Sequence, residues 1–129
     1  MSIAIDHVGI PAADPWAAAR FLGEILAEGE VTPEGPDGEM ASLSIGDGSL
    51  SYFGLPSHEP HHVALRVSGP VLAGAIVRLR QRGVPFGNDP SDPANGHLDH
   101  PLAPRGLYFR TPDGHLIEVI TPPVARTPR

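Results

Sequence analysis

Histidine and glutamate are the residue types in this chain that could bind a metal ion. The 129 residues include seven His and no Cys, which excludes disulfides, thiolate ligands and Cys nucleophiles. His7 and His62 lie in short runs rich in β-branched residues, and Glu118 interrupts the apolar run HLIEVI. A carboxylate inside an apolar strand is costly unless it is paired or binds a metal. Two His and one Glu from three strands can form a facial N,N,O site with open positions, which suits Fe(II) and related divalent ions.

An internal repeat strengthens the case for the two His residues. The segment HVGI at 7–10 recurs as HVAL at 62–65. A lone His on a strand is usually a surface residue or a hydrogen-bonded core residue. Such residues have no reason to recur at equivalent positions. Side chains alternate along a strand, so His62 should face away from the apolar, helix-covered side, and the repeat places His7 likewise.

The first copy of the repeat spans about residues 3–56. A strand over 3–10 should be followed by a helix that begins at Asp14-Pro15, with Asp as N-cap, and ends near Gly29. The rest of the copy is predicted as a loop and two strands joined by Gly46-Asp47-Gly48: 33–38, 40–45 and 50–55.

The second copy, about residues 60–122, repeats this order with an insertion within 88–104. Its predicted elements are a strand, an amphipathic helix and two closing strands: 62–65, 71–82, 107–110 and 115–121. The closing turn contains Asp113-Gly114, and His115 after it is expected to be exposed.

The two turns also align the copies around Glu118. Matching Asp113-Gly114 to Asp47-Gly48 makes Tyr52 the position of the first copy that is equivalent to Glu118. The protonated phenol of Tyr52 is a poor ligand at neutral pH. We therefore expect three protein ligands, with about three positions of an octahedral ion left open.

A sheet face that is too large for one copy to bury can be buried by two copies side by side. The sequence therefore predicts a single α+β domain over 1–129, with helices outside a curved mixed sheet and a cup inside. Residues 123–129 are expected to form a frayed tail.

Charge and hydropathy exclude several classes of partner. Nine basic and fifteen acidic residues give a net charge of −6 and a pI near 5.5, which argues against nucleic acid and anionic membranes. No apolar run is long enough to span a membrane. The first residues, MSIAIDHVGI, do not read as a secretory signal, so a cytoplasmic location is expected.

The doubled unit, with His7 and His62 opening its halves and Glu118 in GHLIEVI, resembles the vicinal oxygen chelate superfamily. This superfamily includes glyoxalase I, extradiol dioxygenases, fosfomycin-resistance enzymes and bleomycin-resistance proteins. The resemblance covers Ile3 to Thr121. It implies paired βαβββ repeats, a cup-shaped site for a small-molecule substrate and often a homodimer. It also implies one divalent ion, with Fe(II) favoured and Mn, Ni, Zn or Co as alternatives.

The segment from His100 to Glu118 resembles the C-terminal signature of extradiol dioxygenases, in which a His, a Tyr, a Pro-x-Gly turn and the iron-binding Glu follow at set spacings. Leu98 departs from that pattern. The resemblance implies that Tyr108 contacts a substrate hydroxyl group and that His100 lies on a loop behind the ligands.

Other polar residues complete the expected active site. His97 could substitute for His100, and either His or Tyr108 could take a proton from a catechol. We expect Arg105 to contact an anionic substrate, and Tyr52 to lie at the substrate.

Three functions compete at this point. The first is O2-dependent ring cleavage of a catechol-like substrate chelated to Fe(II). The second is non-redox metal chemistry of the glyoxalase or fosfomycin-resistance type, in which the ion acts as a Lewis acid. The third is metal-free drug sequestration of the bleomycin-resistance type. The metal triad favours an enzyme over a binding protein, and the spacing from His100 to Glu118 favours the dioxygenase.

Overall fold

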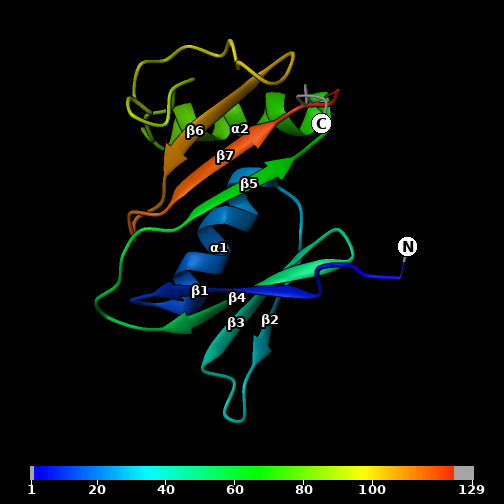
Figure 1. The fold of residues 1–129 in the computed structure, drawn as a ribbon. Coiled ribbons are helices and arrows are strands. Elements are labelled where there is room, and N and C mark those ends of the chain that lie inside the picture. Colours follow the sequence, from blue (N-terminus) through cyan, green and yellow to red (C-terminus); the bar gives the residue numbers. More distant parts are fainter. Residues whose placement is uncertain (1, 124–129) are drawn as a thin grey trace. The chain divides into compact units, whose positions relative to one another are not determined.

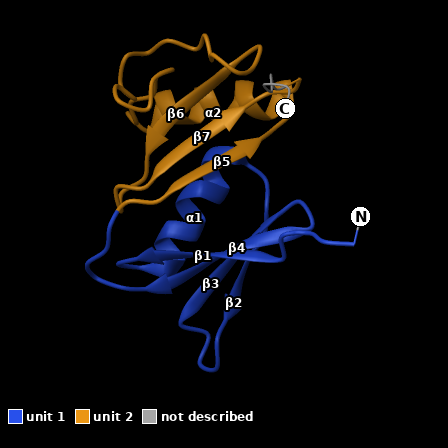
Figure 2. Ribbon diagram, in the orientation of Figure 1, with its two compact units in different colours: residues 1–59 blue, residues 60–129 orange. Residues whose placement is uncertain are grey.

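The computed structural model describes residues 2–123, which form an α+β fold (Figure 1). Most of the predicted tail 123–129 lies outside these residues. The α+β class is confirmed. The chain divides into two compact units, residues 1–59 and 60–129 (Figure 2). No helix among the described residues is long and apolar enough to cross a bilayer.

Unit 1 contains the order strand, helix, three strands. Its elements are β1 (His7–Ala12), α1 (Pro15–Leu26), β2 (Val31–Glu34), β3 (Met40–Ile45) and β4 (Gly48–Gly54). The sheet order is β1-β4-β3-β2, in which β1 runs parallel to β4 and the other pairs are antiparallel. This is the expected βαβββ unit. Strand β2 is a correction, because it includes part of the segment predicted as a loop.

Helix α1 begins where its capping residues indicate. The Asp14 side chain accepts a hydrogen bond from the Ala17 N–H (3.1 Å), and Pro15 fills the first helical position. The helix ends with Ala27 in the left-handed conformation, short of the predicted Gly29. Its Gly23 lies against Leu43 of β3, so the Leu43 side of the sheet is the side that α1 covers.

Unit 2 contains one strand fewer than unit 1. Its elements are β5 (His62–Arg66), α2 (Gly69–Gln81), β6 (Gly106–Arg110) and β7 (Leu116–Ile120), and the sheet order is β5-β7-β6. The long segment 82–105 adds an isolated bridge from Gly87 to Tyr108. The expected fourth strand of this copy is therefore replaced by a loop that bonds to β6 through Gly87 and through the Leu98 carbonyl, which accepts from the Gly106 N–H (3.3 Å).

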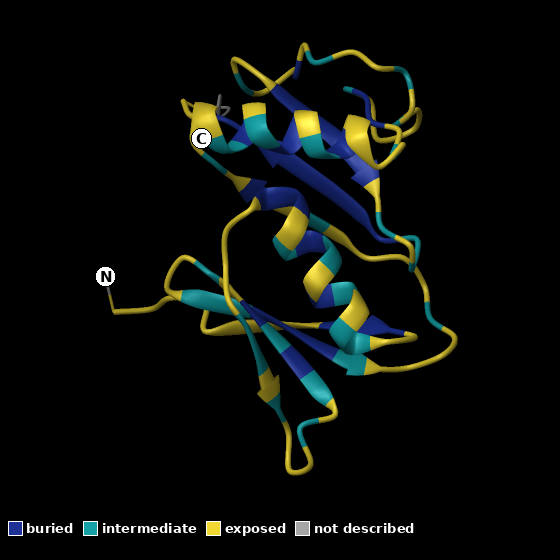
Figure 3. Cartoon of the chain, turned by 180° about the vertical axis from the view of Figure 1, so that it is seen from behind, coloured by how far each residue is buried: buried dark blue, intermediate teal, exposed yellow. Residues whose placement is uncertain are grey.

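Strands β6 and β7 of unit 2 are largely buried (Figure 3), and one face of the sheet packs with α2 in the core. The strand residues of this face are buried, and so are four residues of α2: Leu65, Leu107, Phe109, Ile117 and Val119, with Leu72, Ala75, Ile76 and Leu79. Because side chains alternate along each strand, His62, Tyr108 and Glu118 lie on the opposite face. The strand registers thus agree with the prediction that His62 faces away from the helix-covered side of the sheet.

Candidate functional site

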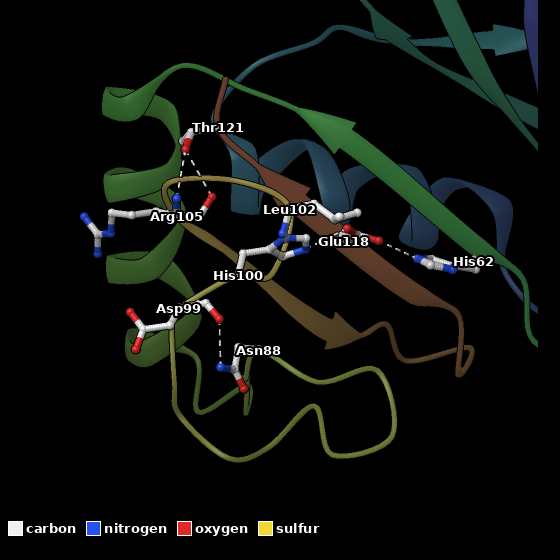
Figure 4. Close-up of polar contacts among 8 residues, drawn as sticks. All are labelled: His62, Asn88, Asp99, His100, Leu102, Arg105, Glu118 and Thr121. Carbon is white, nitrogen blue, oxygen red and sulfur yellow. Dashed lines mark hydrogen bonds and ion pairs between the residues drawn. The ribbon is translucent and has the colours of Figure 1, made fainter. Parts of the chain in front are cut away.

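Glu118 lies between two histidines in unit 2 (Figure 4). Its Oε1 is 2.9 Å from His62 Nε2, and its Oε2 is 2.7 Å from His100 Nε2. The register explains the first contact, since β5 pairs with β7 and sets Ala64 opposite Glu118, two residues from His62. The Glu118 side chain is only 8% exposed, and the two imidazoles provide the partners that a buried carboxylate requires.

Tyr108 completes this group, which we call the Glu118 cluster (His62, His100, Tyr108 and Glu118). Tyr108 is directly opposite Glu118 in the β6–β7 register. Its ring stacks on His100, with centroids 5.6 Å apart, and is 6.0 Å from the ring of His62. Burial and the negative charge of Glu118 raise the pKa of Tyr108 above its ordinary value of about 10. The phenol is therefore protonated at neutral pH and can donate a hydrogen bond.

The donor atoms of His62 and Glu118 fit a divalent ion. Two neighbouring ligands, each about 2.1 Å from an octahedral ion, lie about 3.0 Å apart. The 2.9 Å between His62 Nε2 and Glu118 Oε1 matches that separation. Both atoms offer lone pairs to a metal once the proton between them is lost. No group of three His, Asp or Glu side chains in residues 2–123 is arranged to hold a metal ion. The assignment of His62 and Glu118 as two of the three expected ligands therefore stays a prediction.

His7, the third predicted ligand, belongs to unit 1 and is paired with Asp6. The His7 Nδ1–H donates to Asp6 Oδ2 (2.8 Å), and this hydrogen bond raises the pKa of His7 above its usual value. Nε2 is then the nitrogen with a lone pair, as in the carboxylate–histidine pairs that accompany metal ions. Nε2 is thus the His7 atom that could bind a metal ion, and His7 as a ligand stays a prediction.

The alignment of Glu118 with Tyr52 is corrected by the strand registers. In unit 2, Ala64 lies opposite Glu118; in unit 1, the equivalent Gly9 lies opposite Ser51. Ser51 is therefore the counterpart of Glu118. Its hydroxyl is buried and has no hydrogen-bond partner among the described residues.

Tyr52 consequently lies on the other face of its sheet. It is buried and sits opposite Ile10 and Ala41, on the side where Leu43 contacts α1. A role of Tyr52 at the substrate stays a prediction that this placement does not favour.

Arg105 and His97 lie on the long loop of unit 2 without joining the Glu118 cluster. The Arg105 backbone binds the Thr121 side chain, while its guanidinium points away from Glu118 in Figure 4. His97 is exposed, and its backbone N–H donates to Asn95 Oδ1 (2.8 Å). The roles predicted for both side chains stay predictions.

His115 corrects another expectation. The residue is buried, and its Nδ1 accepts a hydrogen bond from the His61 N–H (2.9 Å). It connects the start of β7 to the segment before β5, so its role is structural rather than that of a surface residue.

Sequence reasoning missed two contributors to the site. Asp6 could have been found, because a carboxylate adjacent to a candidate ligand His is a common supporting pair. Gly106 gave no such signal: a Cβ at this position would lie 2.8 Å from His100 Cδ2, which only the folded loop reveals.

Comparisons with known proteins agree with this architecture. The family model described as Glyoxalase/Bleomycin resistance protein/Dioxygenase superfamily matches residues 4–119. The solved structure of "Oxidase ChaP-H2" is 34% identical, with a TM-score of 0.85 over 96% of this chain and 97% of that one. "Oxidase ChaP-H1" is 31% identical, with a TM-score of 0.86 over 95% and 98%.

A more distant structure has the same fold. A glyoxalase/dioxygenase from Nostoc punctiforme is 23% identical, with a TM-score of 0.66 over 93% of this chain and 91% of that one. No curated protein matches the chain.

Proposed function

Because this chain belongs to the Glyoxalase/Bleomycin resistance protein/Dioxygenase superfamily, we propose that it is a metal-dependent enzyme that cleaves the ring of a catechol-like substrate with O2. Members of the superfamily are mostly metal-dependent enzymes acting on small molecules. The observation that carries the proposal is the His62–Glu118 pair, whose 2.9 Å separation fits two neighbouring ligands of one divalent ion.

We assign the ion to His62, Glu118 and the Asp6-supported His7. This facial set leaves positions for two vicinal oxygens of a substrate and for O2, and Fe(II) is the ion that such a set favours. Bound Fe(II) would supply the redox chemistry between a chelated catechol and O2. A homodimer in the cytoplasm remains part of the proposal.

The reaction balances without another reductant. Both atoms of O2 enter the product, the carbon–carbon bond beside the two hydroxyl groups breaks, and the substrate itself reduces O2. The catechol must also give up a proton when it binds. Tyr108 is suited to donate a hydrogen bond to a substrate oxygen, because its raised pKa keeps the phenol protonated. His97, on the loop of unit 2, is the candidate that remains for accepting the proton.

Two observations favour this reaction over the alternatives. The relatives ChaP-H1 and ChaP-H2 are named oxidases, which supports redox chemistry rather than Lewis-acid chemistry. Ser51, the counterpart of Glu118, supplies a hydroxyl where the resemblance to glyoxalase I implies an additional carboxylate.

A panel of substrates tests the proposal. Protein loaded with Fe(II) without oxygen is given catechol, substituted catechols and resorcinol, whose hydroxyl groups are not adjacent. We expect O2 uptake equal to catechol consumed, a new ring-opened product by mass spectrometry, and no reaction with resorcinol or with the Glu118→Gln variant. No O2 uptake with any catechol by iron-loaded protein would contradict the proposal. Isomerisation of a hemithioacetal instead would favour the glyoxalase type.

A further inference from the structure

His100 holds Glu118 from the side opposite His62. Its side chain is 0% exposed, although it comes from the long loop between α2 and β6. The 2.7 Å contact from Nε2 to Glu118 Oε2 is shorter than the one from His62 to Oε1. A loop histidine whose side chain is fully buried against a candidate ligand needs an explanation.

The hydrogen bonds of His100 define which nitrogen carries its proton. The backbone N–H of Leu102 points at Nδ1 (3.0 Å). A backbone amide can only donate, so Nδ1 must be the acceptor with a lone pair. The neutral ring then carries its proton on Nε2, from which it donates to Glu118 Oε2. Neither nitrogen is left with a free lone pair for a substrate proton.

Several contacts fix this ring in place. It stacks on Tyr108 at an interplanar angle of 22°. Gly106 leaves room for it, since a Cβ there would overlap with the imidazole. Behind it, the Asn88 side-chain amide donates to the Asp99 carbonyl (2.9 Å), next to His100 in the chain. These contacts therefore hold the His100 imidazole in one orientation.

We propose that His100 is a positioning residue. Its Nε2–H donates a hydrogen bond to Glu118 Oε2, which leaves Oε1 as the oxygen that binds the metal ion. The inference rests on the proposed function, because it requires Glu118 to be a ligand. It replaces the expectation that His100 takes a substrate proton. Supporting residues of this kind typically change metal affinity about 10- to 100-fold when they are removed.

The tautomer is tested on metal-free wild-type protein. Long-range ¹H–¹⁵N spectra of the ¹⁵N-labelled protein distinguish a protonated ring nitrogen from an unprotonated one. We expect His100 to carry its proton on Nε2 alone. A proton on Nδ1 would overturn the proposal. This measurement does not depend on any variant folding or on any metal binding.

Metal affinity tests the consequence. Co(II), whose visible absorption reports its ligands, is titrated into the wild type, His100→Leu and His100→Gln. A Gln amide can place an N–H near the position of Nε2, so we expect His100→Gln to retain most of the affinity and His100→Leu to bind about 10- to 100-fold more weakly. Equal affinity of His100→Leu and the wild type would overturn the inference.

The two failures are distinguishable. A wild type that binds no Co(II) or Fe(II) would overturn the proposed metal site itself. The spectra would then still decide whether His100 donates to Glu118. Circular dichroism of His100→Leu establishes that a loss of affinity does not come from unfolding.

Discussion

The hydrogen bond between Asp6 and His7 would support His7 in its proposed role as a metal ligand. Their side chains are largely exposed, so the 2.8 Å hydrogen bond stabilises the fold little. Its effect is on the imidazole: Nδ1–H is fixed on Asp6, and Nε2 keeps the lone pair that a metal needs. The pair is therefore better explained by binding than by folding.

Removing Asp6 should weaken metal binding. We expect Asp6→Ala to lower the affinity for Co(II) about tenfold, the lower end for supporting carboxylates, because the pair is solvated. Isothermal titration calorimetry measures the change. Asp47→Ala, which removes another exposed carboxylate in the turn between β3 and β4, is the matched control and should bind like the wild type. Equal losses in both variants would show only a general effect of charge.

We expect the stability of the folded protein to fall at alkaline pH as the Tyr108 hydroxyl group ionises. Its pKa is raised in the folded state by burial and by Glu118, so the folded chain keeps this proton to higher pH than the unfolded chain. Its contribution is fully present below about pH 10 and is lost as pH rises through the folded pKa. Urea unfolding between pH 8 and pH 11 should show a steeper loss in the wild type than in Tyr108→Phe. Tyr52 is present in both the wild type and Tyr108→Phe, so its contribution cancels in the comparison of their unfolding curves. Parallel curves would rule out the raised pKa.

The same substitution separates binding from catalysis. Tyr108→Phe keeps the ring that stacks on His100 and removes only the phenolic hydroxyl. We expect turnover of the best catechol to fall about 10- to 100-fold, the lower part of the range for an acid–base group, while Co(II) affinity is unchanged. Unchanged turnover would remove Tyr108 from the reaction.

At the scale of elements, the start of β6 depends on the small size of Gly106. A methyl group there would meet His100 Cδ2 and Ile120 Cγ2 at less than 3.0 Å. We expect Gly106→Ala to destabilise the protein by about 1–3 kcal/mol, as overpacking does, and to weaken metal binding by displacing His100. Chemical unfolding measures the first effect.

Gly69→Ala is the control for that substitution. Gly69 begins α2, and nothing lies within 4 Å of a Cβ built there. Alanine should therefore be neutral or stabilise by up to about 1 kcal/mol. If the two variants were equally destabilised, the close contact of Gly106 with His100 would not be the cause.

Helices were the most predictable elements, because local chemistry defines their ends. Asp14-Pro15 marks the start of α1. The second helix was predicted from residue 71, whereas α2 begins at Gly69 after its N-cap Ser68. Strand β2 escaped prediction because Pro33 reads as a loop residue. At the edge of the sheet a missing N–H costs little, which is where β2 lies.

The predicted alignment of the two copies was wrong because their closing turns differ in length. Residues 46–47 connect β3 to β4, whereas residues 111–115 connect β6 to β7. Matching the Asp-Gly pairs aligned turn residues rather than strand partners, which gave Tyr52 in place of Ser51. Alternation along strands predicted the face on which His62 lies, whereas the strand of Glu118 is apolar on both faces and left its direction open. The approach of His100 was not predictable, since it depends on hydrogen bonds among loop residues such as Asn88 and Asn95.

The whole molecule consists of two units whose boundary, after Glu59, falls between the predicted repeats. The proposed ligands are divided between them, with His7 in unit 1 and the other two in unit 2. Because a ligand that binds only the folded state stabilises it, loading with metal should also raise the melting temperature of the wild type.

Metal content tests the central claim most directly. The protein is purified without oxygen and without a metal-binding tag, exposed to Fe(II), freed of unbound ion and analysed for its elements. The account predicts about one Fe per chain in the wild type, as one facial site requires. It predicts loss of most of that iron in His62→Ala and Glu118→Gln, with circular dichroism unchanged. No uptake by the wild type, or full retention by both variants, would contradict it.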